Sequence, residues 1–551
     1  MERVYFTLCS MRFFSFISTL VLVCGAAVSA APGSKPNILF VLTDDQDILL
    51  GSSDYQPKIK KLLQEEGITI TNQFVSTPVC CPSRGSFLTG KHIHNIPMKN
   101  NSLEGNCSGP AWNNGPEKET IGVKMKGLGY ETFFSGKYLN QYGAPGAGGV
   151  EHVPPGWDKW VGLVGNSRYY NYTISNDGAK EVHGDNYATD YLTDVVKNHT
   201  INFIRSQANS GKPFFAMASV PACHSPHEPA PQYAFHFQPE KKVPRNPNYG
   251  TGWNEKHWLV ENEGKIWEAN PVRAQFSDWE HNRRLEVLLS VDDMVEELVG
   301  VLDTLNVLDN TYIFYTADHG YHLGQFGLMK DKRFPYEFDI RTPSYVRGPK
   351  LGKNIKTGLT MLNIDYLPTF IAIGNGEVDK SIDGRSVLAD LEAATAAAER
   401  PTVEGRDFLV EYFGEHGAPA KGGACGAQWS EGMACWTEGN EKLQPGPFKG
   451  GLLCSCQDSI NNTYACIRRV NGGSPRASSL DSSKLSSMNG LGENFLYCKF
   501  SGNPTFEEYY DIDEDPWQLK NAMDTLDVEQ RDYLRQKLKK FVACSGTDSC
   551  R

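Results

Sequence analysis

The sequence predicts an α/β fold in which a mostly parallel sheet lies between helices, followed by a smaller α+β domain. Short apolar segments of strand length alternate with longer amphipathic segments, which is typical of parallel sheets covered by helices on both faces. Polar clusters recur directly after the apolar segments. The 551 residues, 40% of them apolar and 22% charged, are enough for one large globular domain and a smaller one.

The first strand is expected at residues 38–42, because a continuous apolar run is typical of a strand buried on both faces. This run ends in the adjacent acids Asp44 and Asp45. Further strands are expected at residues 130–134, 213–220 and 311–315. Because ligands in open α/β sheets lie beyond the carboxyl ends of strands, the polar residues that follow these segments are expected to share one site.

Helices are expected at residues 59–66, 198–206, 283–306 and 528–542. Another helix is expected to open at the segment Cys80-Cys81-Pro82-Ser83-Arg84. Proline suits a first helical turn, and the free amide groups there favour anions. A nucleophile at such a helix start, beside an arginine, suits attack on a phosphoryl or sulfuryl group.

The composition changes near residue 400, where we expect the boundary between domains of residues 31–400 and 401–551. Residues 417–456 and 471–491 are rich in Gly and Ser and are expected to be loops. Cysteines crowd after residue 425, which indicates disulfides in the second domain, with Cys544–Cys550 as one short loop. Fourteen cysteines, less two in the leader and Cys80, leave an odd eleven, so Cys223 is a candidate free thiol.

Residues 1–30 have the pattern of a cleaved secretory signal: Arg3 and Arg12, an apolar run at 13–23, and small residues at 28 and 30. The alternative, a retained anchor, is disfavoured because the run is short for a membrane span. No later apolar run is long enough, so no span is expected after signal removal. Glycosylation sequons stand at Asn100, Asn106, Asn171, Asn198 and Asn461.

The net charge of -11 argues against a nucleic-acid partner, which usually requires a basic surface. It leaves room for a local basic pocket that holds an anionic substrate. The oligomeric state is not readable from the sequence, and a homodimer is one option.

The motif Cys80-x-Pro-Ser-Arg84-x-x-x-Leu-Thr-Gly90 resembles the signature of type I sulfatases. The resemblance implies an alkaline-phosphatase-like fold and oxidation of Cys80 to formylglycine by the formylglycine-generating enzyme. Residues 41–47, 80–94, 134–142, 312–325 and 336–347 look like the N-acetylglucosamine-6-sulfatases of this family. The catalytic part of the heparan endosulfatases is also similar, but the long basic region of those enzymes is not found here.

Hydrolysis of a sulfate ester requires a nucleophile at sulfur, cations on the sulfate oxygens and an acid for the leaving oxygen. A thiol at Cys80 would leave an ester with no easy exit. In an aldehyde hydrate, one hydroxyl attacks sulfur and the other collapses to expel sulfate. The modified Cys80 is therefore the expected nucleophile.

Adjacent acids at a buried strand end favour a hard cation. Asp44, Asp45, Asp318 and His319, with Cys80, resemble the ligands of the one calcium ion that the family binds. His319 departs from the commoner Asn, and a histidine ligand is atypical of calcium. On its own, His319 would more often be a hydrogen-bonding histidine.

Four side chains match the sulfate-site residues of the family: Arg84, Lys137, His224 and Lys332. The resemblance implies that Arg84 orients the formylglycine, that Lys137 and Lys332 bind sulfate oxygens, and that His224 is the general acid. Without the resemblance, solvated lysines would be equally good readings of Lys137 and Lys332.

Many sulfatases carry a histidine just after the lysine that corresponds to Lys137, as the base that regenerates the aldehyde. Here the chain reads Lys137-Tyr138-Leu139-Asn140, with no histidine in that place, and Asn140 is no base. His94 and His227 are the alternatives nearby in sequence. The segment Lys256-His257-Trp258 combines a cation with rings that could stack on a sugar, and an ordinary interface loop is the competing reading.

The sequence thus predicts a sulfatase that removes 6-O-sulfate from N-acetylglucosamine in heparan or keratan sulfate, located in the lysosome. The first alternative is an extracellular, endo-acting heparan 6-O-sulfatase or an arylsulfatase. An inactive glycan-binding glycoprotein would belong to another class, and a phosphatase on the same fold would use unmodified Cys80.

Overall fold

The structure is a computed structural model that describes residues 35–207, 210–237, 241–396, 405–415, 431–436, 453–471, 491–502 and 504–550. The side chains of residues 431–436 and 453–457 are not described. The expected signal at 1–30 and the expected boundary near residue 400 lie outside these ranges. Both therefore stay predictions.

The main sheet has ten strands in the order β10-β2-β9-β8-β1-β7-β3-β4-β5-β6. Its central strands β8, β1, β7, β3 and β4 run parallel to one another. Strand β9 is antiparallel to both of its neighbours, and β5 and β6 form an antiparallel edge. The predicted mostly parallel sheet is confirmed.

The strands of the main sheet are β1 Asn37–Thr43, β2 Ile68–Phe74, β3 Glu131–Lys137, β4 Lys159–Leu163, β5 Thr173–Asn176, β6 Ala179–Val182, β7 Phe214–Ser219, β8 Thr311–Ala317, β9 Ser344–Arg347 and β10 Ile355–Leu362. The helices are α1 Pro57–Ile59, which continues into a π-helical turn, α2 Cys80–Thr89, α3 Pro110–Asn114, α4 Ile121–Gly127, α5 Tyr187–Asp190, α6 Leu192–Gln207, α7 Trp258–Ala269, α8 Val272–Thr304, α9 Glu337–Ile340, α10 Tyr366–Ile373, α11 Leu388–Ala396 and α12 Val528–Phe541.

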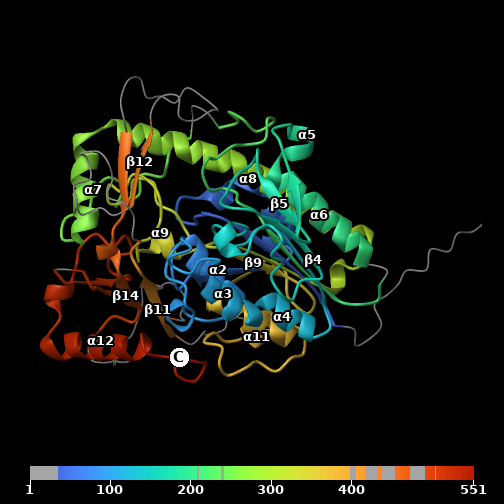
Figure 1. The fold of residues 1–551 in the computed structure, drawn as a ribbon. Coiled ribbons are helices and arrows are strands. Elements are labelled where there is room, and N and C mark those ends of the chain that lie inside the picture. The colour runs from blue at the N-terminus through green and yellow to red at the C-terminus, as the bar shows by residue number, and fades with distance from the viewer. Residues whose placement is uncertain are drawn as a thin grey trace, which may run out of the picture.

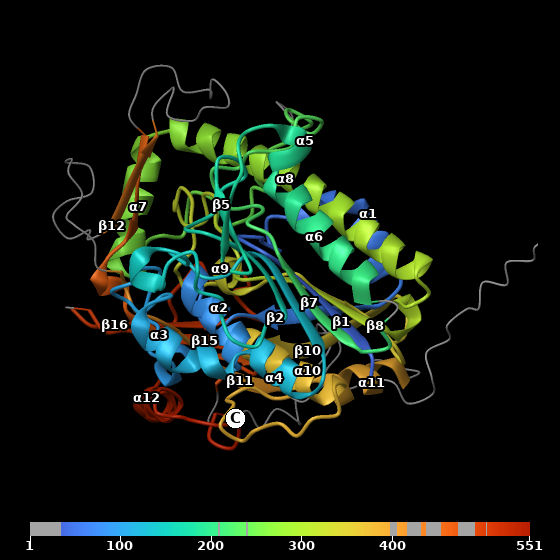
Figure 2. The ribbon, with the colours of Figure 1, turned by 45° about the vertical axis from the view of Figure 1, so that its right-hand side comes forward.

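Helices cover both faces of the sheet. Helices α1, α6 and α8 lie on one side of strands β7, β1 and β8, and α2, α4 and α10 lie on the other (Figures 1 and 2). Strand β1 explains this layering, because Ile38, Phe40 and Leu42 belong to one hydrophobic cluster and the alternate residues Leu39 and Val41 to another. A strand buried on both faces is what its continuous apolar run predicts.

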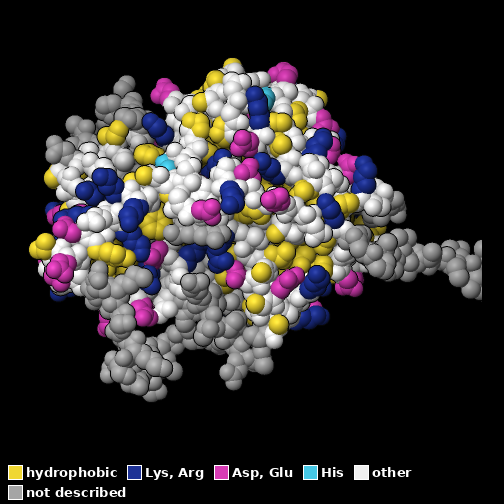
Figure 3. All heavy atoms as spheres, turned by 90° about the horizontal axis from the view of Figure 1, so that it is seen from below, with side chains coloured by type: hydrophobic (Ala, Val, Ile, Leu, Met, Phe, Trp, Pro, Cys, Tyr) yellow, Lys and Arg dark blue, Asp and Glu magenta, His cyan; other side chains and the backbone are white. Residues whose placement is uncertain are grey.

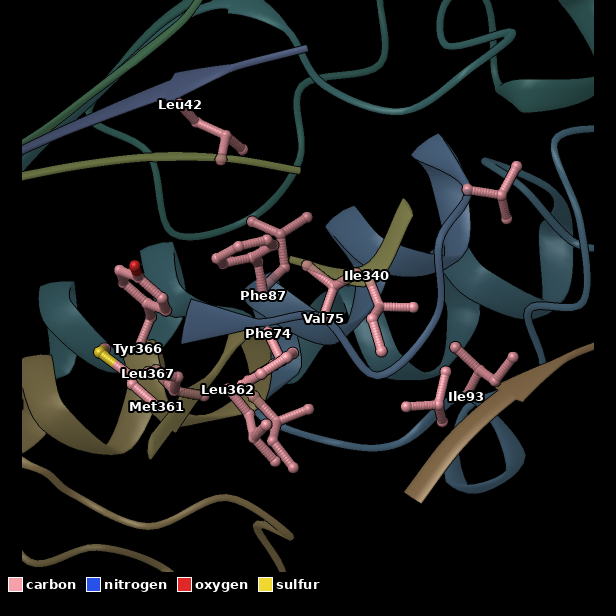
Figure 4. Packing of buried hydrophobic residues seen from close by; sticks show 14 of the residues in the cluster. Leu42, Phe74, Val75, Phe87, Ile93, Ile340, Met361, Leu362, Tyr366 and Leu367 are labelled. Carbon is pink, nitrogen blue, oxygen red and sulfur yellow. The ribbon is translucent and has the colours of Figure 1, made fainter. Parts of the chain in front are cut away.

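The cluster that seats α2 is aromatic and aliphatic (Figure 4). The rings of Phe87 in α2 and Tyr366 in α10 lie 5.0 Å apart, and Phe40 of β1 contacts both of them. Helix α2 is buried along its whole length, so its first residue has a fixed position relative to the sheet.

A second, antiparallel sheet has the order β11-β14-β15-β16. Its strands are β11 Arg406–Tyr412, β14 Tyr464–Val470, β15 Phe495–Phe500 and β16 Phe506–Asp511. Helix α12 packs against it (Figure 1). This is the smaller α+β part that the sequence predicts, and two of its disulfides are Cys466–Cys498 and the expected Cys544–Cys550.

One expectation about this region is wrong. Residues 417–456 are not all loop, because β12 Glu431–Trp436 and β13 Leu453–Asp458 pair antiparallel across a long connection. The Gly and Ser residues around both segments have a low strand propensity, so the local sequence does not predict these strands. Backbone hydrogen bonds between the two segments, which are far apart in the sequence, form the pair.

Charged side chains of both signs are interspersed with apolar ones on the face shown in Figure 3. Among the described residues, no helix is long and apolar enough to cross a membrane.

Candidate active site

Four neighbouring strands, β8, β1, β7 and β3, deliver the polar residues that the sequence singled out. Asp44 directly follows β1, Asp318 directly follows β8, and Lys137 is the last residue of β3. His224 lies five residues beyond β7. The carboxyl ends of these parallel strands lie at one edge of the sheet, which gives the residues a common location.

Helix α2 begins at Cys80, so the candidate nucleophile is the first helical residue. Val79 before it is extended and offers no side-chain cap. Instead, the backbone N–H of Cys81 donates to Asn101 Oδ1 at 2.9 Å, and a disulfide joins Cys81 to Cys107. The free amides of a helix start favour an anion, as the motif predicts.

Asp44 is buried between cations. Its Oδ2 accepts hydrogen bonds from Lys137 Nζ and from Ser167 Oγ, the latter at 3.1 Å. Its Oδ1 lies 3.7 Å from Cys80 Sγ. Burial alone would raise the pKa of this carboxyl, but Lys137, His224 and Arg84 outweigh burial and hold the pKa well below its usual range. Asp44 is therefore a carboxylate at any working pH.

Arg84 donates hydrogen bonds from two nitrogens of its planar guanidinium group. Its Nε donates to Asp318 Oδ2 at 2.8 Å, and one terminal nitrogen donates to the Lys137 carbonyl at 2.7 Å and to Ser219 Oγ at 2.8 Å. The side chain is 2% exposed. Arg84 thus joins the ends of β8, β3 and β7 through one planar group, which a lysine could not do.

Asp45 pairs with Lys332, the fourth candidate cation of the site beside Lys137, His224 and Arg84. Lys332 Nζ lies 2.8 Å from Asp45 Oδ1, and the Asp45 carbonyl accepts from a terminal nitrogen of Arg284. Burial opposes ionisation of Asp45, but Lys332 and His224 outweigh burial and lower its pKa. Asp45 has a positive φ of 62°, a conformation that turns the chain sharply after β1.

Asp44, Asp45, Cys80 and His319 form a candidate metal site. Their ligand atoms all lie within 4.8 Å of one another, and all four residues are buried. Buried carboxylate oxygens are the donors that hard divalent cations prefer. The residues of this site therefore fit a divalent metal.

Asp318 lies at the edge of this group. Its Oδ1 accepts from the Asp45 N–H at 3.2 Å and lies 3.5 Å from His319 Nε2, while its Oδ2 is bound by Arg84. Burial and the charge of Asp44 raise the pKa of Asp318 to about 6. A bound cation would offset the part of this effect that comes from the negative charge of Asp44.

His319 Nε2 lies 3.4 Å from Cys80 Sγ. Burial opposes a charged ring, but Asp318 and Cys80 outweigh burial and raise the pKa of His319 to about 10. A ligand must be deprotonated to bind metal, so a proton on His319 and a divalent cation would offset the same negative charges.

His224 is half-buried, and its Nδ1 lies 2.7 Å from the Ser225 carbonyl oxygen. That contact assigns the proton of Nδ1 and leaves Nε2 as the atom that can exchange a proton. Burial favours the neutral ring, but Asp45 and Asp44 outweigh burial and raise the pKa of His224. A protonated ring at acidic pH is what a general acid requires.

The two histidines considered as alternative bases have other partners. His94 contacts Glu411 through Nδ1 and the Cys544 carbonyl through Nε2, both at 2.8 Å. His227 Nδ1 contacts the Cys223 carbonyl, and its Nε2 lies 3.3 Å from Glu280. The ring nearest to Cys80 among the described contacts is His319, which the sequence did not single out as a base.

The segment Lys256-His257-Trp258 is an interface and not an open sugar-binding surface. Lys256 Nζ binds Tyr510 and the Gln518 carbonyl, and the His257 ring stacks on Phe500 with centroids 4.3 Å apart. Both residues are buried. Tyr510 and Gln518 belong to the C-terminal part of the chain, so Lys256 joins the two parts of the molecule.

Sequence reasoning missed two hydroxyls of the site, Ser167 and Ser219. Ser219 is the last residue of β7, so the rule that points to strand ends could have found it. Ser167 lies in a loop with no such signal. Gly136, before Lys137, has φ of 105°, and a Cβ there would lie 1.9 Å from the Ser219 carbonyl oxygen. Only glycine lets β3 approach β7 closely enough at this point.

The predicted sequons differ in exposure. Asn171 and Asn198 are exposed, Asn106 and Asn461 are half-buried, and Asn100 is buried with its Oδ1 bound to Ser102. Asn100 is therefore the least accessible acceptor. Cys223 is a buried free thiol, as the cysteine count suggested.

The Sulfatase family profile matches residues 36–375, which contain every candidate catalytic and metal-binding residue named above. The chain belongs to the sulfatase family. Membership makes it a sulfuric ester hydrolase, and the predicted enzyme class is confirmed.

Two relatives illustrate the range of the family. The chain is 41% identical to human N-acetylglucosamine-6-sulfatase over 538 residues, which is 97% of this chain and 89% of that protein. It is 41% identical to an extracellular sulfatase SULF-1 homolog of Drosophila melanogaster over 390 residues, which is 70% of this chain but only 34% of that protein.

A solved structure of a protein in complex with its substrate D-glucosamine-2-N,6-O-disulfate superposes with a TM-score of 0.67. It is 21% identical and covers 92% of this chain and 97% of that chain. This likeness confirms the alkaline-phosphatase-like fold of sulfatases, including the smaller antiparallel sheet.

Proposed function

We propose that the protein hydrolyses the 6-O-sulfate ester of N-acetylglucosamine units in heparan sulfate or keratan sulfate. The observation that carries the proposal is the near-full-length similarity to N-acetylglucosamine-6-sulfatases, together with a buried site that holds a helix-start cysteine among cations and carboxylates. An arylsulfatase of other specificity would be expected to share the site, but with a lower identity along the chain than the 41% found with the N-acetylglucosamine-6-sulfatase.

The modified Cys80 would supply a hydroxyl that attacks sulfur and a second hydroxyl that expels sulfate and restores the aldehyde. The surrounding residues would bind the sulfate group and orient the reacting atoms. Arg84 holds the strand ends in place, Lys137 and Lys332 place positive charge where sulfate oxygens would lie, and His224 Nε2 would donate a proton to the leaving oxygen. Proton removal from the second hydroxyl has no assigned group.

Calcium is the metal that we propose, held by Asp44, Asp45, Asp318, His319 and the modified Cys80. The carboxylates support a hard cation, and the imidazole of His319 makes the set unusual for calcium. When bound, the ion would polarise a sulfate oxygen and lower the pKa of the attacking hydroxyl.

The wider proposals follow from the sequence and the family. Residues 1–30 would be a cleaved signal, residues 31–400 the catalytic domain and residues 401–551 the C-terminal domain. The protein would be a glycoprotein of the lysosome, with secretion as the alternative. The formylglycine-generating enzyme would be its partner during biosynthesis.

An endo-acting extracellular 6-O-sulfatase is the second candidate, because the SULF-1 homolog is similar over 70% of this chain. The chain spans about a third of that relative, however, whereas it spans most of the N-acetylglucosamine-6-sulfatase. The full-length match favours exo action.

The test combines two measurements on the protein secreted from a eukaryotic host. Mass spectrometry of the peptide around position 80 should show formylglycine, and the protein should release sulfate from N-acetylglucosamine 6-sulfate. Release from internal units of intact heparin would favour the second candidate. Unmodified cysteine at position 80 with efficient turnover of phosphate esters would overturn the sulfatase mechanism.

A further inference from the structure

The loop that carries Lys332 is held by residues from the C-terminal part of the chain. Arg333, the next residue, extends into a buried acidic group: its terminal nitrogens lie 3.2 Å from Glu415 Oε2 and 3.6 Å from Asp458 Oδ2, and its Nε lies 3.4 Å from Asp331 Oδ2. The Arg333 side chain is 11% exposed. Arg333 therefore faces three carboxylates, one from its own loop and two from the far side of the interface.

The backbone of this loop is strained. Asp331 has φ of 117° and Arg333 has φ of 98°, which are unfavourable for residues with a side chain. Such conformations persist only when the surroundings over-determine them. The Arg333 carbonyl supplies part of that constraint, because it accepts hydrogen bonds from Asn462 Nδ2 at 3.2 Å and from the Tyr464 hydroxyl at 3.1 Å.

The strain sets the position of Lys332. Its Nζ lies 2.8 Å from Asp45 Oδ1, inside the candidate metal site, while the residues on both sides of it are fixed outside that site. Because Lys332 stands between two strained residues, release of Arg333 would let the backbone relax and move the ammonium group.

Glu415 has a second partner on the nucleophile side. Its Oε1 accepts from the Asn101 N–H at 2.9 Å, and Asn101 Oδ1 in turn accepts from the Cys81 N–H at 2.9 Å. The backbone N–H of Glu415 donates to Asp458 Oδ2 at 2.9 Å. One glutamate from the C-terminal part thus contacts the Lys332 loop through Arg333 and the start of α2 through Asn101.

We propose that Arg333 and Glu415 are positioning residues, through which the C-terminal part of the chain holds Lys332 and the start of α2 in their catalytic arrangement. They touch neither Cys80 nor the candidate metal ligands in the described contacts. This inference rests on the proposed role of Lys332 as a sulfate-binding cation. It assigns the C-terminal part of the chain a role in turnover beyond stability.

The test is a double-mutant cycle on N-acetylglucosamine 6-sulfate with Arg333→Gln, Lys332→Ala and the double variant. Because a displacement of about 1 Å can cost on the order of 10²-fold, R333Q should lower kcat/KM roughly 10- to 100-fold. If Arg333 acts through Lys332, R333Q should change kcat/KM less than about threefold in the K332A background. Arg333→Lys, which keeps the charge, should recover part of the loss.

The matched control is Arg468→Gln. Arg468 is another buried arginine of the same interface, with its Nε 2.7 Å from Glu337 Oε1. R468Q should lower the thermal unfolding temperature comparably while it leaves kcat/KM within about twofold. Equal activity losses in R333Q and R468Q would overturn the inference, as would fully multiplicative losses in the cycle.

Two further outcomes of the experiment, an unfolded R333Q variant and a wild-type protein without activity on this substrate, also test the inference. If R333Q gives no folded protein, the more conservative R333K replaces it in the same cycle, and multiplicative losses there overturn the inference. A wild-type protein that leaves N-acetylglucosamine 6-sulfate intact contradicts the proposed substrate alone. The cycle is then measured on an aryl sulfate ester, where the same non-additivity supports the positioning role.

Discussion

Arg84→Lys tests whether the site needs a planar fork or only a positive charge. The substitution keeps the charge beside Asp318 but replaces several donors in one plane by a single ammonium group. Of the three hydrogen bonds of Arg84, the one to Asp318 can be retained. The two to the Lys137 carbonyl and Ser219 Oγ come from a terminal nitrogen that lysine lacks.

The expected loss of stability depends on whether the former partners of Arg84 keep another hydrogen bond. A hydrogen bond from a charged donor contributes about 1.5–3 kcal/mol. The Lys137 carbonyl keeps a donor, because Ser219 Oγ lies 2.7 Å from it, so the cost should stay near the lower end. We expect about 3 kcal/mol for the two bonds. We also expect roughly a 10²-fold loss of kcat/KM, because the ends of β3 and β7 are no longer joined.

The assay compares sulfate release and thermal unfolding of the variant with those of Arg205→Lys, an exposed arginine in α6. The control should stay within about 0.5 kcal/mol of the wild type. Wild-type turnover by R84K would refute the reasoning, because charge alone would then suffice at this position.

Three other predictions concern the nucleophile, the metal and pH. Cys80→Ser should keep the fold, as judged by unfolding temperature, and lower sulfate release by at least about 10³-fold; retained activity would contradict the mechanism. Asp44→Ala should lower the metal content per chain in elemental analysis and abolish most activity, and an unchanged metal content would contradict the ligand assignment. Burial opposes charging of His94, but its hydrogen bond to Glu411 outweighs burial and raises its pKa. The stability from this pair is therefore complete below about pH 6.5 and is lost as the pH rises through the folded-state pKa. His94→Gln should cost roughly 1–2 kcal/mol at pH 5 and less at pH 8, and an equal cost at both would count against the pair.

The sequence predicted the elements whose burial is uniform. Strands β1, β7 and β8 are apolar on both faces and were found within two residues of their ends. Strand β6 was missed, because its residues are mostly exposed at the sheet edge and carry no alternating apolar pattern. Pairing with β5 creates it, and such pairing is not written in the local sequence.

Some residues of the site could likewise be predicted from the sequence, and others could not. Asp44 and Lys137 could be found because a strand end precedes or carries each of them, and Arg84 because a helix start and a family motif mark it. Ser167 and Glu415 could not, because neither directly follows or ends a predicted strand, and each has its contact with a residue far away in the sequence, Asp44 and Asn101 respectively. Glu415 lies 335 positions after Cys80, and only the packed interface brings it near the nucleophile helix.

The burial of α2 has a consequence for biosynthesis. Cys80 is 0% exposed, and its neighbour Cys81 is tied to Cys107. An enzyme that oxidises Cys80 would need access to its Sγ, so it would have to act before α2 docks against the sheet. A chain that folds first would then stay unmodified for as long as the start of α2 remains docked.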